Sequence, residues 1–174
     1  MASSAFPPEP LAVIAQEVSD LLKEKGESVA VAETAAGGLV SASLLATPGA
    51  SKIYKGGVTL YTLESRIAYA GWTEENLKDY KGPTPDLVAG LAEHTRKTLG
   101  STYVVGESGT AGPTGGTTKN RIPGYVALAV SSANGTYKRE LDTGFGKDRQ
   151  KNMVGFAVEA LTLLRDVLKG DAKL

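Results

Sequence analysis

Hydrophobic residues recur at helical spacing in four parts of the chain. In the first part Leu11, Ile14, Val18 and Leu22 are three or four positions apart, and Gly26 follows them. This spacing predicts an amphipathic helix over 11–25 that the glycine ends. The same pattern predicts helices over 37–46, 84–99 and 147–168, with shorter helical pieces over 64–69 and 74–78.

Five apolar and β-branched runs between these helices are typical of strands. They cover 28–32, 52–62, 102–105, 124–131 and 136–143, and the dipeptide Asn134-Gly135 between the last two is a strong hairpin signal. Gly56-Gly57 predicts a bulge or bend in the second run. Helices and strands alternate in the first half and a hairpin follows. We therefore predict one α/β domain over 10–170, with three α/β/α layers and a mixed sheet, after a flexible leader over 1–9.

Composition narrows the kind of partner. The 174-residue chain has 19 acidic and 19 basic residues, whereas a nucleic-acid binder needs a surplus of basic residues to neutralise phosphates. We therefore expect no nucleic-acid partner. Cysteine is absent and His94 is the single histidine, which excludes a disulfide framework, a cysteine nucleophile and a histidine-rich metal site. We expect no bound metal.

The beginning of the chain lacks a basic segment followed by a long apolar run, so we expect no signal peptide. No stretch approaches the roughly 20 apolar residues that span a bilayer. From the sequence we expect a cytoplasmic protein with no membrane partner.

The first candidate site is the turn after the strand 28–32, with the sequence AETAAGG over 32–38. Ligands of open α/β sheets bind at the carboxyl ends of strands, and N–H groups at a helix start favour an anion or a carbonyl oxygen. Gly37 and Gly38 let a ligand approach the backbone, while Glu33 and Thr34 add a carboxylate and a hydroxyl. The alternative is an ordinary connection in which Thr34 caps the helix.

The second candidate site is the turn ESGTAGPTGG over 107–116, which follows another apolar strand. Its four glycines and Pro113 demand special backbone angles. A flexible surface loop has a similar composition, but a mere linker would not need Ser108 and Thr110 directly after a buried strand. The turn matches neither a Walker A loop nor a dinucleotide-binding G-x-G-x-x-G motif.

Taken together, the two turns resemble one known family. The chain contains, in order, the segments AETAAGGLVSASLLATPGAS, YKGGVTLYTLESR, SGTAGPTGG and IPG-Y. They are similar to the C-terminal domain of the CinA (competence/damage-inducible) proteins, over about residues 10–168. That domain also occurs alone as a nicotinamide mononucleotide deamidase. The resemblance therefore implies hydrolysis of the carboxamide of nicotinamide mononucleotide to nicotinic acid mononucleotide and ammonia, with no cofactor.

The resemblance also implies roles for particular residues. The family's proposed serine nucleophile falls on Thr34, and its tyrosine, lysine and second hydroxyl residue fall on Tyr61, Arg66 and Ser108. The family's arginine before the last helix falls on Arg149, which would suit the ligand's phosphate. Backbone N–H groups over 35–37 would stabilise the developing oxyanion. The remaining substrate-binding residues would come from the two turns: Glu33, Ala35, Ala36, Gly37, Gly38, Gly109, Thr110, Ala111 and Gly112.

The chain departs from the family pattern inside this set. Thr34 replaces the serine, and its extra methyl restricts the rotamer and crowds a substrate. Arg66 replaces the lysine, and an arginine does not release its proton in proteins, so it cannot be the general base. Ala35 and Ala36 replace a cysteine and a threonine. Unless Tyr61, Glu33 or another group is the base, a serine–lysine mechanism cannot operate unchanged.

Three interpretations follow. The chain is an amidohydrolase acting on nicotinamide mononucleotide or a related nucleotide amide, or a catalytically silent member that binds a nucleotide or related metabolite. In the third interpretation it keeps the fold without a ligand. The resemblance further implies a homodimer.

Overall fold

A computed structural model describes residues 6–174, so residues 1–5 of the predicted leader lie outside the described part. Five strands form one sheet in the order β2-β1-β3-β4-β5. The first three, β2 (Tyr54–Thr59), β1 (Val29–Glu33) and β3 (Tyr103–Gly109), run parallel to one another. The other two, β4 (Tyr125–Ser132) and β5 (Gly135–Asp142), are antiparallel to their neighbours, so the predicted mixed sheet is confirmed.

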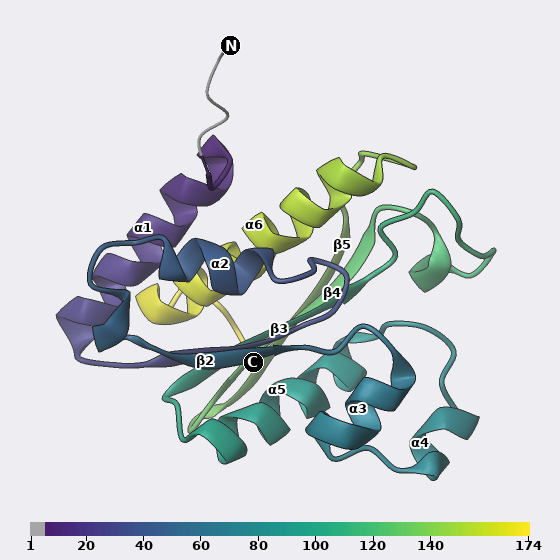
Figure 1. The fold of residues 1–174 in the computed structure, drawn as a ribbon, viewed down its shortest axis with the longest axis horizontal. Coiled ribbons are helices and arrows are strands. Elements are labelled where there is room, and N and C mark those ends of the chain that lie inside the picture. Colours follow the sequence, from purple (N-terminus) through teal and green to yellow (C-terminus); the bar gives the residue numbers. More distant parts are fainter. Residues whose placement is uncertain (1–5) are drawn as a thin grey trace.

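Helices cover both faces of this sheet, which confirms the three-layer α/β/α arrangement (Figure 1). One face carries α1 (Glu9–Lys25), α2 (Leu39–Leu45) and α6 (Arg149–Lys169). The other carries α5 (Pro85–Leu99) and α3 (Leu63–Ala70), with the short α4 (Glu74–Lys78) beside them. Within residues 6–174, no helix has the length and apolar character needed to cross a bilayer.

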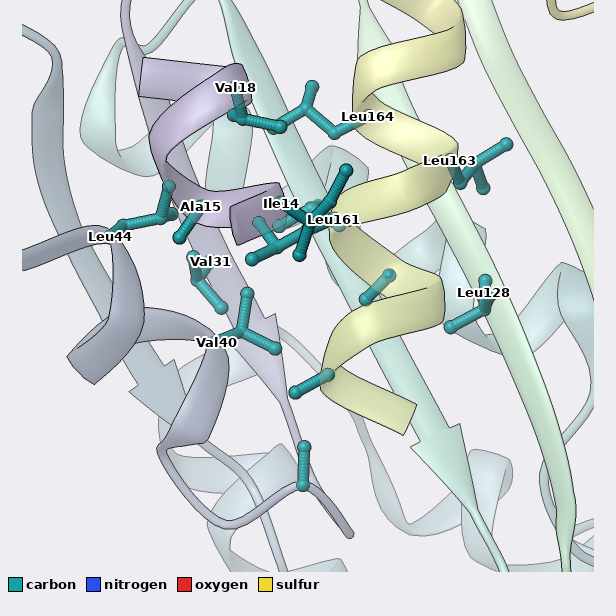
Figure 2. Close-up of a cluster of buried hydrophobic side chains, with 14 of the residues drawn as sticks. Ile14, Ala15, Val18, Val31, Val40, Leu44, Leu128, Leu161, Leu163 and Leu164 are labelled. Atoms are coloured by element: carbon teal, nitrogen blue, oxygen red, sulfur yellow. The ribbon is translucent and has the colours of Figure 1, made fainter. Parts of the chain in front are cut away.

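Alternation along β1 divides the interior into two cores, because successive side chains of a strand point to opposite faces. Val29 and Val31 belong to the core under α1, α2 and α6, whereas Ala30 and Ala32 belong to the core under α5. Figure 2 shows the first core, where Val31 packs among side chains of those three helices. Every residue of β1 is buried. The carboxyl end of this strand therefore lies in the middle of the molecule.

The predicted ends of the first helix at Gly26 and of the helix at Gly100 agree with the structure, whereas α2 and α6 begin two residues later than predicted. Gly26 and Gly100 end α1 and α5 in the left-handed conformation, at φ +64° and +62°. Thr84 begins α5, where its hydroxyl oxygen accepts a hydrogen bond from the Leu87 N–H at 3.2 Å. Local capping chemistry was enough to place these boundaries.

Two details of the strands differ from the prediction. The extra residue of β2 is Lys55, one position before Gly56, where the register against β1 shifts. The hairpin loop is residues 133–134, because Gly135 already pairs with Ser132. The Ser132 hydroxyl donates to the Gly135 carbonyl at 3.0 Å and accepts from the Asn134 N–H at 3.2 Å, which closes the loop one residue earlier than predicted.

Candidate functional site

The two glycine-rich turns lie side by side at the carboxyl ends of β1 and β3. These strands are parallel neighbours with Ala32 opposite Gly106, so the residues that follow both strands leave the sheet at the same end. Thr34 and Ser108 meet there, and the Thr34 hydroxyl donates a hydrogen bond to Ser108 Oγ at 3.0 Å. Both residues are buried, at 3% and 2% exposure. The fold thus pairs two hydroxyls that are 74 positions apart in the sequence.

The strand β3 is longer than predicted, and this extension positions the second hydroxyl. The sequence predicts a strand that ends at 105, but Ser108 and Gly109 still pair with Ala127 and Val126 of β4. The antiparallel neighbour therefore holds the start of the second turn as regular sheet. Ser108 is consequently fixed by a strand and not by a loop.

Glu107 lies beneath the first turn, and the sequence prediction did not include it among the site residues. Its Oε2 accepts hydrogen bonds from the backbone N–H groups of Thr34 and Ala36, at 3.0 and 2.9 Å. Its Oε1 is buried and has no hydrogen-bond partner among residues 6–174. The detectable signal was a carboxylate in the apolar strand YVVGESG, where an acidic residue has to find buried donors.

The pKa of the Glu107 carboxyl is raised to about 7, chiefly by burial and in part by the charge of Glu33. The two backbone N–H groups and the guanidinium of Arg66 act in the opposite direction. Desolvation dominates because only one of the two carboxylate oxygens has donors. Glu107 is thus an acid–base group that titrates near neutral pH directly behind Thr34.

By contrast, the Glu33 carboxylate accepts hydrogen bonds at the start of α2. Its Oε2 accepts from the Val40 N–H at 3.1 Å, and its Oε1 accepts from the Ser41 N–H and hydroxyl at 3.1 and 2.8 Å. Glu33 thus binds N–H groups at the start of α2 and none of the N–H groups over 35–37, and this carboxylate, not Thr34, satisfies the start of the helix. The N-cap position itself is Gly38, in the left-handed conformation at φ +98°.

The backbone of the first turn has few donors left for an oxyanion. The Ala36 N–H is bound to Glu107, and the Gly37 N–H donates to the Thr34 carbonyl at 3.2 Å. Gly37 also adopts a left-handed φ of +70°, and a β-carbon there would lie 3.0 Å from Met153 Cε. Of the three N–H groups over 35–37, the one on Ala35 has no acceptor within the described residues.

Arg66 projects from α3 into a corner between two aromatic rings. Its guanidinium carbon is 5.1 Å from the ring centre of Trp72 and 5.2 Å from that of Tyr80. The residue is 3% exposed, and its Nε–H donates to the Leu60 carbonyl at 3.4 Å. Leu60 follows directly on β2, and its N–H donates to the Glu33 carbonyl. Because Arg66 binds Leu60, it lies at the same end of the parallel strands as Thr34.

Arg149, at the start of α6, ties the second turn to the loop after β2. Its Nη1–H donates to the Gly112 carbonyl at 2.7 Å, and its Nη2–H donates to the Tyr61 hydroxyl at 3.2 Å. Tyr61 is 59% exposed, so this bridge lies on the surface and not with the buried hydroxyls. A phosphate at Arg149 would have to share the guanidinium with these two partners.

Hydrogen bonds from backbone and side-chain groups hold the second turn in place. The Thr110 N–H donates to the Tyr125 carbonyl at 2.9 Å, and the Thr110 hydroxyl donates to the Asn120 carbonyl at 3.0 Å. The Ala111 carbonyl accepts from the buried side chain of Asn152 at 3.0 Å. These bonds leave a hollow of about 300 Å³ beside the turn, lined among others by Tyr80, Gly109, Thr110 and Arg121.

This hollow is lined by two residues of the predicted substrate-binding set, Gly109 and Thr110, and by neither Thr34 nor Ser108. Two larger hollows, of about 490 and 560 Å³, are lined by the start of α1 with α6 and by α4 with α5. Neither is lined by Thr34 or Ser108. Among residues 6–174, no group of three or more acidic or histidine side chains is arranged to hold a metal ion.

Comparison with known proteins identifies the family of the chain. The family model described as the CinA C-terminal domain matches residues 11–168. A CinA-like protein of Anaeromyxobacter is 36% identical over 148 residues, which is 85% of this chain and 36% of the relative. A CinA-like protein of Prochlorococcus marinus is 33% identical over 154 residues, which is 88% of this chain and 34% of the relative. The chain thus spans about a third of the length of these curated relatives.

Solved structures show the same fold. The competence/damage inducible protein CihA from Agrobacterium tumefaciens superimposes with a TM-score of 0.85 at 24% identity, over 95% of this chain and 99% of that one. A CinA superfamily protein from Klebsiella pneumoniae gives a TM-score of 0.84 at 21% identity, over 92% and 98%. With the match of the family model over nearly the whole chain, these findings show that the chain belongs to the CinA C-terminal domain family.

Proposed function

We propose that this chain hydrolyses the carboxamide of nicotinamide mononucleotide, or of a related nucleotide amide, to the carboxylic acid and ammonia. The observation that carries the proposal is the buried Thr34–Ser108 hydroxyl pair, between the two turns that bear the family motifs. Family membership supports the chemistry, because the family includes deamidases of this nucleotide.

In the proposed reaction, Thr34 Oγ1 attacks the carboxamide carbon. The hydrogen bond from Thr34 to Ser108 provides a route for the proton. Ser108 Oγ accepts the Thr34 proton and donates its own to the leaving nitrogen, so the carbon–nitrogen bond breaks and ammonia departs. Water then attacks the ester on Thr34, the ester bond breaks, the carboxylic acid is released, and one proton of the water returns to Thr34 Oγ1 while Ser108 keeps its hydroxyl proton. A relay of two hydroxyls contains no strong base, so we expect slow turnover.

The other site residues position this pair. Glu107 holds the backbone N–H groups of Thr34 and Ala36, which fixes the peptide that carries the nucleophile. Arg149 and Tyr61 close the surface side of the second turn through Gly112. In this proposal the substrate occupies the hollow lined by Gly109 and Thr110, the two residues that follow Ser108 in the chain.

Ammonia release from nicotinamide mononucleotide by the purified chain tests the proposal. We expect ammonia and nicotinic acid mononucleotide in equal amounts, and loss of both in Thr34→Ala and Ser108→Ala. Tyr69→Phe is a control, because Tyr69 is 69% exposed and belongs to neither turn. No product from folded wild-type protein at high concentration would rule out the proposed activity.

A second candidate function is binding without turnover. The specific observation in its favour is the burial of both hydroxyls, together with an arginine, Arg66, at the position of the family's lysine. Calorimetry with nicotinamide mononucleotide separates the two functions, since heat of binding without ammonia favours the binding module. A homodimer and a cytoplasmic location are further predictions, which light scattering and fractionation of cells would test.

A further inference from the structure

Arg66 is a buried cation that makes one hydrogen bond within the described residues. Its buried Nη1 has no acceptor among residues 6–174, and its Nε–H makes one long hydrogen bond to the Leu60 carbonyl. In that part of the chain, the arginines that form ion pairs are Arg139 and Arg165. Taking a guanidinium out of water without acceptors is unfavourable. An acceptor that enters the site therefore gains more from Arg66 than from an exposed arginine.

The nearby carboxylates already have other donors. Glu33 accepts from the backbone of α2 and from the Ser41 hydroxyl, and Glu107 accepts from the Thr34 and Ala36 N–H groups. Neither accepts a hydrogen bond from Arg66. The positive charge of Arg66 acts on the Glu107 carboxyl through space, where it lowers the pKa of that group.

Two aromatic rings hold the guanidinium in place. The Trp72 and Tyr80 rings meet edge to face, with centres 6.1 Å apart, and Arg66 packs against both. Tyr80 also lines the hollow that is lined by Gly109 and Thr110. Arg66 therefore packs against a residue that also lines this hollow. Cation–π contacts fix the plane of the group and leave its N–H edge for a ligand.

We propose that Arg66 is a receptor for a carboxylate, and that the site binds the acid form of its nucleotide ligand more tightly than the carboxamide form. The inference rests on the proposed function for the identity of the ligand. A guanidinium presents paired N–H donors that match both oxygens of a carboxylate. A carboxamide offers one acceptor oxygen, and its amino group turns a donor toward the cation. The position that holds the family's lysine thus serves here to bind the product anion.

Isothermal titration calorimetry tests the inference with two probes. Nicotinic acid mononucleotide carries the carboxylate, and 3-acetylpyridine mononucleotide is a neutral analogue without a carbon–nitrogen bond to hydrolyse. We expect the wild-type chain to bind the acid about tenfold or more tightly than the ketone, as a charged hydrogen bond in a buried site allows. Arg66→Gln should reduce this preference to less than about threefold, and Arg66→Lys should retain part of it.

Controls separate recognition of the carboxylate from effects on folding or overall charge. Arg165→Gln removes the same charge from α6, where Arg165 pairs with Asp166 and Glu17, and should leave the preference unchanged. If Arg66→Gln lacks a cooperative unfolding transition, the inference is tested by the affinities of wild type and Arg66→Lys for the two probes.

Equal affinities of the two probes for wild type overturn the inference. So does the absence of binding by either probe to folded wild type, and so does an equal loss of both affinities in Arg66→Gln. The ammonia assay reports separately on the proposed function. Preference for the acid without ammonia release would support the carboxylate receptor and reject the hydrolase. Ammonia release without such a preference would support the hydrolase and reject the carboxylate receptor.

Discussion

Replacing Glu107 by glutamine would show how the buried carboxyl affects stability. Glutamine keeps one carbonyl oxygen, which can accept from the Thr34 and Ala36 N–H groups as Glu107 Oε2 does. Its amino group takes the place of the buried Oε1. Glu107→Gln therefore resembles the protonated acid and does not titrate.

The magnitude follows from the pKa, which burial raises from 4.5 to about 7. Each pKa unit corresponds to about 1.4 kcal/mol, so the difference amounts to about 3 kcal/mol. Below pH 4.5 the carboxyl is protonated in both the folded and the unfolded chain, and it does not lower the free energy of unfolding. As the pH rises toward 7, the unfolded chain releases this proton first, so the free energy of unfolding falls. Above pH 7 the carboxyl is ionised in both states, and the free energy of unfolding falls no further because of this group.

Urea unfolding of wild type and Glu107→Gln between pH 4.5 and 8 measures this effect. We expect the two free energies of unfolding to be similar at pH 4.5, and the variant to be more stable by about 3 kcal/mol at pH 8. Glu75→Gln on the exposed surface of α4 is the matched control. A difference between Glu107→Gln and wild type that stays constant across this range would refute the reasoning, because the stability would then not depend on protonation of Glu107.

Three further substitutions, one of them with a matched control, test the packing and chemistry of the site. Gly109→Ala should cost about 1–3 kcal/mol in urea unfolding, because its β-carbon would lie 2.8 Å from the Phe156 ring. Gly90→Ala has no neighbour within 4 Å and should instead add roughly 0.5–1 kcal/mol; equal effects of these two alanines would contradict the assigned contact. Asn152→Ala leaves two backbone carbonyls without its donors, so we expect the unfolding free energy to fall by about 2–4 kcal/mol, and an unchanged value would argue against these bonds. Thr34→Ser removes the crowding methyl and should speed ammonia release severalfold, whereas a slower serine variant would count against Thr34 as the nucleophile.

Much of the fold was predictable because its signals are local. The spacing of apolar residues predicted the helices, and glycines at 26 and 100 marked two of their ends. Errors arose where a neighbouring strand decides the boundary. Gly109 belongs to β3 because it pairs with β4, and no pattern within residues 102–110 reveals that partner.

The candidate site was predictable to the extent that its motifs are contiguous. The two turns, Thr34 and Ser108 were recognisable from the sequence, and the structure places their hydroxyls 3.0 Å apart. The role of Glu33 was not recognisable, because a carboxylate after a strand can face a ligand or a helix start. The structure shows that it binds the start of α2.

Residue types and their spacing along the chain predict the order of helices and strands, the family motifs and the replacements at Thr34 and Arg66. The burial of Glu107, its pKa of about 7, and the packing of Arg66 against Trp72 and Tyr80 without an ion-pair partner in the described part come from the folded arrangement. They do so because desolvation and charge pairing depend on which distant segments enclose a group.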